Sequence, residues 1–328
     1  MKNLIGIMIL IIAFIIWLFS DQLRFPGATP ESCTIFTVQY GDTVLFGNNE
    51  DYTNPNTYYW VSPSTMQFYG GVYVGYDNFD PQGGINEKGL SFDYNALPKG
   101  VLNFKSGLPP LHGNPGVIIL RECTTVKEAI ELAKSYNWGT SLRYQMHVAD
   151  ATGDAVVISA GPDGELAFER KEKGDRYLVS TNFNLAHHQK NERKGLCRRY
   201  DTAVEMLEKI EDEHDVTVEY VTSILDAVHA EGAKSNTLYS NIFDLRNGVI
   251  YLYYWHQFHE GVTLNVADEI AKNADPTRIK DLFSQETVDQ ASREFQKYQE
   301  KGGKGCLGTA FIMVLLVINA LLLPYRRR

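Results

Sequence analysis

One cysteine in this chain could act as a nucleophile without help from a histidine. Cys33 stands where an apolar leader gives way to the first predicted core strand. If cleavage made it N-terminal, it would carry a thiol and an α-amine, with reference pKa values of about 8.5 and about 7.7–8.0. The amine could then accept the thiol proton near neutral pH, as in N-terminal nucleophile enzymes. A buried structural cysteine is the other interpretation of this residue.

Polar segments follow Cys33 along the chain, and their order is more informative than any one of them. These segments are Cys33-Thr34 followed by Gly47-x-Asn49-x-Asp51-Tyr52, GINEKGL at 84–90 with Asn95 shortly after, ADATGD at 149–154, Ser180-Thr181-Asn182-Phe183, Arg198-Arg199-Tyr200 and YSNIFDL at 239–245. In this order, from Cys33 to about residue 268, the series resembles the choloylglycine hydrolase and penicillin acylase/acyltransferase families of N-terminal nucleophile amidases. Acid ceramidase and N-acylethanolamine acid amidase are more distant members of the same group.

The resemblance implies roles for the nucleophile and its nearest helpers. Cys33 would attack the amide carbonyl, and its α-amine would pass the proton to the leaving amine. Asp51 would hold that amine in position, although an aspartate directly after a strand is also typical of a turn. Arg199 would stabilise the thiolate, with its neighbour Arg198 as the alternative, because adjacent helical residues cannot both face inward.

The resemblance also implies donors for the oxyanion. Asn182 would donate a side-chain N–H, and a main-chain N–H near Asn95 would be the second donor; a plain turn residue is the other interpretation of Asn182. The chain departs from the bile salt hydrolase branch at Asn48, where that branch has an arginine. Losing this charge leaves the thiol pKa less depressed and weakens the case for a bile salt substrate. Asn48 and Asn49 are expected to bind substrate.

The sequence contains no motif that predicts a metal site or a cofactor. Neither CxxC nor HExxH occurs, and the adjacent pair His187-His188 has no third partner close to it in the sequence. Such a pair is more typical of a loop than of a metal centre. We therefore expect the chemistry to depend on protein side chains alone.

Composition and charge narrow the class of protein. The 328 residues are 44% hydrophobic and 22% charged, which is ordinary for a folded globular chain. The net charge of −9 makes a nucleic-acid partner unexpected. Four cysteines are too few for a scaffold built on disulfides.

The residue pattern predicts the strands and helices that carry these segments. The predicted strands and the predicted helices occur in separate groups along the chain, which indicates an α+β fold. The resemblance makes this a four-layer αββα sandwich in one domain at 33–275. The predicted strands are 34–40 and 43–48, joined through the turn Gly41-Asp42, and 72–76, 89–94, 144–150, 155–159, 177–180 and 249–255; helices are predicted around 126–133, 203–210 and 216–228.

An uncharged apolar run lies on each side of this domain. The run 4–19 is either the apolar part of a signal peptide or a short membrane helix, so 1–32 is assigned to a signal or anchor and a propeptide. The segment 307–325 is predicted to be a transmembrane helix, because three arginines follow it at 326–328 as a basic cytoplasmic tail.

The stretch between domain and predicted membrane helix is polar and mixed in charge. We predict that 276–306 is a juxtamembrane linker outside the core. The protein is then expected in the cell membrane, with one or two passes, the catalytic domain on the extracytoplasmic side and the lipid bilayer as a partner.

The expected function is hydrolysis of a non-peptide linear amide, an N-acyl amide, through a thioester on Cys33. One alternative is acyl transfer of the isopenicillin-N acyltransferase type, in which an amine resolves the thioester. Another is a non-catalytic, membrane-anchored binding protein on the same fold. Because the α-amine of Cys33 exists only after the bond to Ser32 is cut, we expect Cys33 to cut that bond itself. The acyl group, the amine and the oligomeric state are left open.

Overall fold

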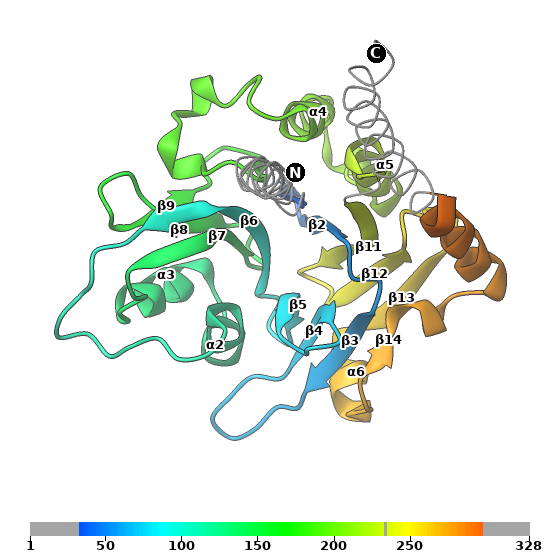
Figure 1. The fold of residues 1–328 in the computed structure, drawn as a ribbon, viewed down its shortest axis with the longest axis horizontal. Helices are drawn as coiled ribbons and strands as arrows, with labels where there is room; N and C mark the ends of the chain where they lie inside the picture. Colours follow the sequence, from blue (N-terminus) through cyan, green and yellow to red (C-terminus); the bar gives the residue numbers. More distant parts are fainter. Residues whose placement is uncertain (1–32, 233–234, 298–328) are drawn as a thin grey trace, which may run out of the picture.

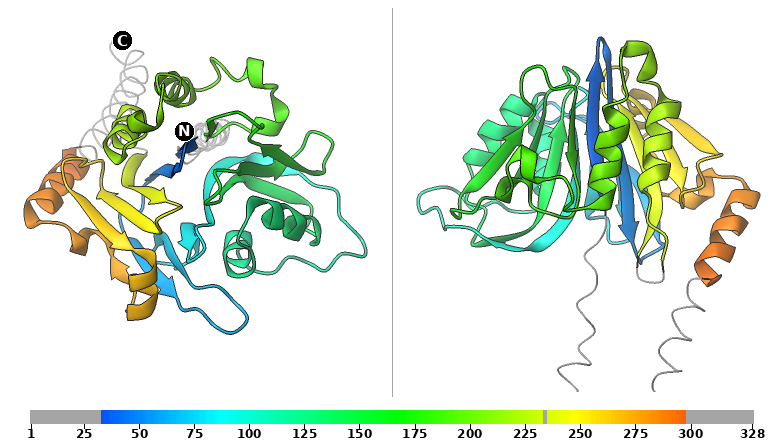
Figure 2. Two further views of the ribbon diagram at one scale, coloured as in Figure 1. Left: turned by 180° about the vertical axis from the view of Figure 1, so that it is seen from behind. Right: turned by 90° about the horizontal axis from the view of Figure 1, so that it is seen from above.

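The computed structural model describes residues 33–232 and 235–297. The chain enters the fold through a hairpin of β1 (Thr34–Tyr40) and β2 (Thr43–Tyr52), as predicted, although β2 continues four residues beyond its predicted end. Gly41 occupies the turn with a φ of +56°, a conformation that glycine adopts without strain. The hairpin runs through the centre of the molecule, where it is drawn in blue (Figure 2).

Two antiparallel sheets form the middle of the fold. The smaller sheet has the strand order β10-β1-β2-β11-β12-β13, and the larger has the order β14-β3-β4-β5-β6-β7-β8-β9. The further strands of the smaller sheet are β10 (Tyr177–Ser180), β11 (Asn236–Asp244), β12 (Val249–Tyr254) and β13 (Gly261–Asn265). The strands of the larger sheet are β3 (Thr57–Ser62), β4 (Gly71–Tyr76), β5 (Pro81–Asn86), β6 (Ser91–Val101), β7 (Ser141–Ala149), β8 (Ala155–Ala160), β9 (Leu166–Arg170) and β14 (Thr277–Arg278).

Helices cover the outer faces of both sheets (Figure 1). The apolar sides of α4 and α5 pack on the smaller sheet, and those of α2 and α3 pack on the larger one. The bounds are α2 (Pro115–Glu122), α3 (Val126–Lys134), α4 (Arg198–Leu207), α5 (Val218–Val228) and α6 (Val266–Lys272), with short 3₁₀ turns η1 (Leu185–His187), η2 (Lys190–Glu192), η3 (Glu213–Asp215) and η4 (Ile279–Leu282). A further helix covers 285–297.

Successive side chains of β1 point into two different apolar cores. Ile35 belongs to the core between the sheets, whereas Phe36 packs toward α4 and α5. Because successive side chains of a strand point to opposite faces, a strand with both faces covered is apolar on both. A third core lies between the larger sheet and α2 and α3. The layers are therefore helix, sheet, sheet and helix, which confirms the expected αββα sandwich.

The prediction that 276–306 lies outside the core is wrong for its described part. Thr277 and Arg278 form β14 against β3. Ile279, Phe283 and Ala291 are buried in the core between the sheets. The domain therefore extends through residue 297, and the polar composition of this stretch had concealed three inward-facing apolar residues.

The two predicted apolar membrane segments, 1–32 and 307–325, lie outside the described residues. Within the described part of the chain, no helix is long and apolar enough to cross a membrane. The strand predicted to begin at Gly89 begins instead at Ser91, because Gly89 occupies a turn with a φ of +78° and lies tightly against the carbonyl oxygen of Leu245.

Candidate active site

The hairpin places Cys33 at the edge of the layer between the two sheets. Its side chain is 2% exposed. The register pairs Thr34 with Asn49, so Cys33 comes opposite Glu50 at the open end of the hairpin. The thiol thus faces the larger sheet, while the next side chain, Thr34, faces the helices that cover the smaller sheet.

Two side chains from different layers hold the backbone of Cys33. Asn95 on β6 donates from Nδ2 to the carbonyl oxygen of Cys33 at 3.2 Å. Arg199 on α4 donates from Nη1 to the same oxygen at 2.9 Å. The main-chain oxyanion donor expected near Asn95 stays a prediction, and the buried side chain of Asn95 in addition holds the backbone of the nucleophile.

The first turn of α4 decides which of two adjacent arginines enters the site. Arg199 is largely buried, with its guanidinium donating to the hydroxyl of Thr34 at 2.7 Å and to Oδ1 of Asn182 at 2.8 Å. Arg198 is exposed. The geometry is thus in line with the choice of Arg199 over Arg198. The guanidinium of Arg199 binds the carbonyl oxygen of Cys33, and its expected action on the thiolate stays a prediction.

Asp51 lies fully buried beside this arrangement. Its Oδ1 accepts the hydroxyl of Thr237, and its Oδ2 lies 3.7 Å from Nη1 of Arg199. That Oδ2 has no hydrogen-bond partner among the described residues. Burial raises the pKa of Asp51 from 3.8 to about 7, although Arg199 and the Thr237 hydroxyl oppose this shift. The site therefore contains a desolvated acceptor close to the start of β1.

Asn182 follows β10 in a loop that β7 holds in place. Gln145 on β7 donates to the carbonyl oxygens on both sides of Asn182, at 2.6 Å to Thr181 and at 3.0 Å to Phe183. The Nδ2 of Asn182 donates to the carbonyl oxygen of Ala96 at 3.0 Å.

The surroundings of the thiol oppose its ionisation. Burial raises the pKa of Cys33 well above its ordinary value, and the nearby carboxylates of Glu50, Asp51 and Asp93 raise it further. The main-chain N–H of Asp51 donates to the sulfur and acts in the opposite direction. In the chain with residue 32 still attached, the thiol is therefore protonated at neutral pH and needs a base.

Sequence reasoning missed the acidic side chains behind the thiol. Glu50 is 3% exposed and accepts the hydroxyl of Tyr76. Asp93 on β6 is fully buried, and burial together with Glu50 raises its pKa well above 3.8. Two carboxyl groups this close in a dry layer do not both ionise readily. Extending the second strand to Tyr52 would have revealed Glu50, because it then falls opposite Cys33.

The structure does not support substrate binding by Asn48 and Asn49. Neither residue lines the cavity next to Cys33. Asn49 points toward α5, where it donates to the carbonyl oxygen of Leu225 at 2.8 Å and accepts the hydroxyl of Ser240 at 2.6 Å. Asn48 is fully buried and donates to Asn241 at 3.4 Å. Asn48 thus joins β2 to β11, and Asn49 joins β2 to both β11 and α5.

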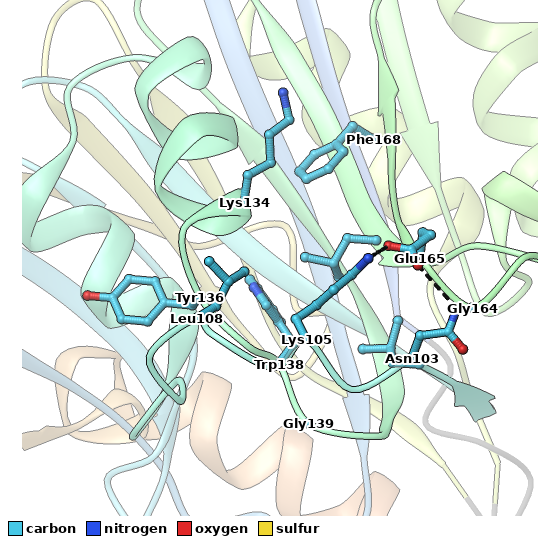
Figure 3. A pocket seen from close by; sticks show the side chains of 12 residues that line it. Asn103, Lys105, Leu108, Lys134, Tyr136, Trp138, Gly139, Gly164, Glu165 and Phe168 are labelled. Atoms are coloured by element: carbon cyan, nitrogen blue, oxygen red, sulfur yellow. Dashed lines mark hydrogen bonds and ion pairs between the residues drawn. The ribbon is translucent and has the colours of Figure 1, made fainter.

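A cavity of about 530 Å³ opens beside the thiol. Its wall is mixed in polarity and differs from the apolar pocket that a steroid or long acyl chain would fill. Residues that line it include Cys33, Glu50, Asp80, Tyr94, Arg143 and Tyr144. A separate hollow of about 470 Å³, lined by Trp138 and Phe168 and edged by a Lys105–Glu165 ion pair (Figure 3), contains none of the predicted site residues.

Comparisons with known proteins agree with this fold. A family model described as acyl-coenzyme A:6-aminopenicillanic acid acyl-transferase matches residues 38–259. A mutant of the conjugated bile acid hydrolase from Clostridium perfringens is similar in structure, with a TM-score of 0.58 and 16% identity, over 75% of this chain and 96% of that chain. Penicillin V acylase from Agrobacterium tumefaciens is similar with a TM-score of 0.54 and 17% identity, over 68% of this chain and 83% of that chain. No curated protein sequence matches the chain.

Proposed function

Because the chain belongs to the acyl-coenzyme A:6-aminopenicillanic acid acyl-transferase family, we propose that it cleaves a non-peptide N-acyl amide through a thioester on Cys33. The observation that carries the proposal is the convergence of separate elements on this residue. Asn95 and Arg199 hold its carbonyl oxygen, and the main-chain N–H of Asp51 reaches its sulfur. A merely buried cysteine has no need of such an arrangement.

Maturation comes first in this mechanism. The thiol of Cys33 attacks the carbonyl carbon of Ser32, and its proton passes to the peptide nitrogen, which leaves as the α-amine of Cys33. Water then hydrolyses the resulting thioester, which releases residues 1–32 with a carboxylate end and restores the thiol. The new amine acquires a partner at once, because Oδ2 of Asp51 lies buried with no hydrogen-bond partner among the described residues. Cleavage thereby supplies the base that the uncut thiol lacks.

The same groups then serve the amide substrate. The α-amine takes the thiol proton, the thiolate attacks the amide carbonyl, and Asn182 donates to the oxyanion. The ammonium returns its proton to the leaving amine as the C–N bond breaks and the thioester forms. Water then attacks the thioester, which gives a carboxylic acid and restores the thiol.

Acyl transfer is the second candidate, and the family model itself favours it, since its description is that of an acyl-transferase. In this reaction an amine takes the place of water and forms a new amide. The two relatives of known structure are named as a bile acid hydrolase and a penicillin acylase, which favours water. The cavity beside Cys33 is large enough for a small acyl group together with its amine.

Membrane attachment belongs to the proposal as well. It rests on the two uncharged runs at 4–19 and 307–324 and on the three terminal arginines. Removal of 1–32 would leave the C-terminal segment as the anchor, with the catalytic domain outside the cytoplasm. A substrate that concentrates at the bilayer surface would then be favoured.

The test is to trap the acyl-enzyme on the purified full-length protein. A panel of N-acyl amides is added, the reaction is quenched in acid, and the mass of the peptide that begins at Cys33 is measured. A mass increase equal to that of the acyl group supports an enzyme, whether it is a hydrolase or an acyl-transferase. Product analysis with and without an added amine then distinguishes hydrolysis from acyl transfer. If the protein has cut itself at Cys33 and yet no amide gives an adduct, the remaining hypothesis is the non-catalytic binding protein.

A further inference from the structure

A cluster of metal-ligating side chains lies outside the candidate active site. His229, Glu231 and His256 each offer one ligand atom, and these three atoms all lie within 4.8 Å of one another. His229 caps the C-terminus of α5, and His256 follows β12. They are 27 positions apart in the chain, so only the fold brings them together, and the pair His187-His188 is not part of the cluster.

Each of the two histidines has a carboxylate beside one of its ring nitrogens. Nε2 of His256 faces Oε2 of Glu294 at 3.0 Å, and Nδ1 of His229 faces Oδ1 of Asp226 at 3.2 Å. A carboxylate only accepts, so Nε2 of His256 carries a proton and the lone pair of this ring is on Nδ1. Both ring nitrogens of His229 face acceptor oxygens, because its Nε2 faces Glu231. In the tautomer with the proton on Nδ1, the lone pair of His229 lies on Nε2, as in the carboxylate–histidine–metal arrangement.

In this tautomer, the nitrogens that keep the lone pairs are Nδ1 of His256 and Nε2 of His229. Nδ1 of His256 is buried and has no hydrogen-bond partner among the described residues, and the His256 side chain is only 6% exposed. Nε2 of His229 lies 2.9 Å from Oε1 of Glu231. A lone pair aimed at a carboxylate is unfavourable unless a cation lies between them.

We infer that His229, Glu231 and His256 bind a divalent transition-metal ion, best matched by Zn²⁺ with water as its fourth ligand. Two imidazoles and one carboxylate form a common tetrahedral zinc set, with metal–ligand bonds of about 2.0–2.2 Å. Ligand atoms in such a set lie roughly 3.3 Å apart, compared with up to 4.8 Å here. The two imidazole rings are stacked with their centroids 4.7 Å apart, so binding of one ion would require the rings to turn toward each other.

Such an ion would connect three parts of the domain near the candidate nucleophile. Glu294 lies on the helix that covers 285–297, so the ion would fasten that helix to the end of α5. The main-chain N–H of Ala230 donates to the hydroxyl of Thr237 at 2.8 Å, and that hydroxyl donates to Asp51. The site is therefore structural, and it supports the position of Asp51 without touching substrate.

Metal binding by the purified full-length protein tests the inference without reference to activity. The protein is treated with chelator, dialysed and titrated with Zn²⁺ by calorimetry, and Co²⁺ is used as a spectroscopic probe. We expect one ion per chain, a tetrahedral Co²⁺ spectrum and a rise in Tm. His229→Ala and His256→Gln should abolish all three, and Glu294→Gln should weaken the Kd by about 10–100-fold.

His187→Ala is the matched control, since His187 is exposed and lies outside the cluster. It should bind Zn²⁺ as the unmodified protein does. A variant counts as folded if its Tm without metal equals that of the unmodified protein. If a histidine variant does not fold, Glu231→Gln is used in its place. The inference is overturned if the protein binds no Zn²⁺. It is equally overturned if binding survives in the folded variants, or if His187→Ala loses it too.

Discussion

Nη1 of Arg199 lies 2.9 Å from the carbonyl oxygen of Cys33, although 166 positions separate these residues in the chain. The same guanidinium binds the Thr34 hydroxyl and lies near Asp51. The first turn of α4 therefore fixes the start of β1. Arg199 acts on the position of the nucleophile's backbone, whereas the charges that act on its thiol are those of carboxylates.

Replacing this guanidinium should damage turnover more than stability. Arg199→Lys keeps the charge but loses the planar set of donors that reaches Cys33, Thr34 and Asn182 together. A misplaced nucleophile typically lowers kcat by about 10²-fold. Arg198→Lys is the control, because Arg198 is exposed. Steady-state kinetics check this prediction, and equal losses in both variants would contradict it.

Cys33→Ala should be inactive and should accumulate with residues 1–32 attached. Cys33→Ser keeps an oxygen nucleophile and should retain a trace of cutting. N-terminal sequencing of the active protein should begin at Cys33. An active protein that still carries residues 21–32 would rule out the α-amine as base.

Asn182→Ala should lower kcat by about 10²-fold or more while Tm stays near normal, because one oxyanion donor is lost. Asn184→Ala is the matched control from the same loop. Asn184 caps η1 and donates to Ala160 at 2.7 Å, so this variant should lose Tm with a smaller effect on kcat. A loss of activity in Asn182→Ala that follows its Tm would instead make Asn182 a structural turn residue.

Glu50→Gln should make the thiol more reactive. The Glu50 carboxylate raises the pKa of Cys33, and the amide removes that charge at nearly constant volume. Each unit by which the thiol pKa falls gives about tenfold more thiolate at neutral pH. Iodoacetamide alkylation as a function of pH measures the effect. Asp80→Asn, which lines the same cavity, should leave the profile unchanged.

The buried Asp51 should make the uncut protein less stable as the pH rises. Its pKa is raised from 3.8 to about 7, so the folded chain binds more protons than the unfolded chain between these values. The free energy of unfolding should therefore fall from pH 4 to pH 7 and then level off. The shift is roughly three units, worth at most about 4 kcal/mol at about 1.36 kcal/mol per unit.

Urea unfolding of Cys33→Ala and of Cys33→Ala/Asp51→Asn compares the two cases at each pH. The slope between pH 4 and pH 7 should be smaller in the double variant, because its residue 51 does not titrate. Identical slopes in the two proteins would mean that Asp51 is ionised throughout this range.

The sequence predicted the hairpin well because a glycine turn and two β-rich runs are local signals. The end of β2 was predicted less well, since Asn48, Asn49, Glu50 and Asp51 look solvent-facing although all four are buried. Their side chains meet partners on other strands and helices, such as Tyr76 for Glu50 and Thr237 for Asp51, which no local pattern reveals. The order of fragments indicated Cys33, Asp51, Asn182 and Arg199, and the structure brings these together.

What the sequence could not supply is contact between distant segments. Asn95 was expected near the site, but its bond to the carbonyl of Cys33 depends on how β6 crosses β1. Likewise, Ile279 and Phe283 are covered only because β14 pairs with β3. Strand pairing over such separations in sequence depends on the whole fold. The polar residues around Ile279 and Phe283 make the composition of this stretch typical of an exposed segment, so composition did not predict their burial.

The arrangement around Cys33 has a consequence for biosynthesis. The side chains that hold or influence this residue come from β2, β6, the loop after β10 and α4, so nearly the whole domain must fold before they meet. A chain that cuts itself through these groups cannot expose a reactive N-terminal thiol while it is half made. If the protein cuts itself as proposed, self-cleavage would test the fold of each copy, because a misfolded copy would keep residues 1–32 and stay inactive.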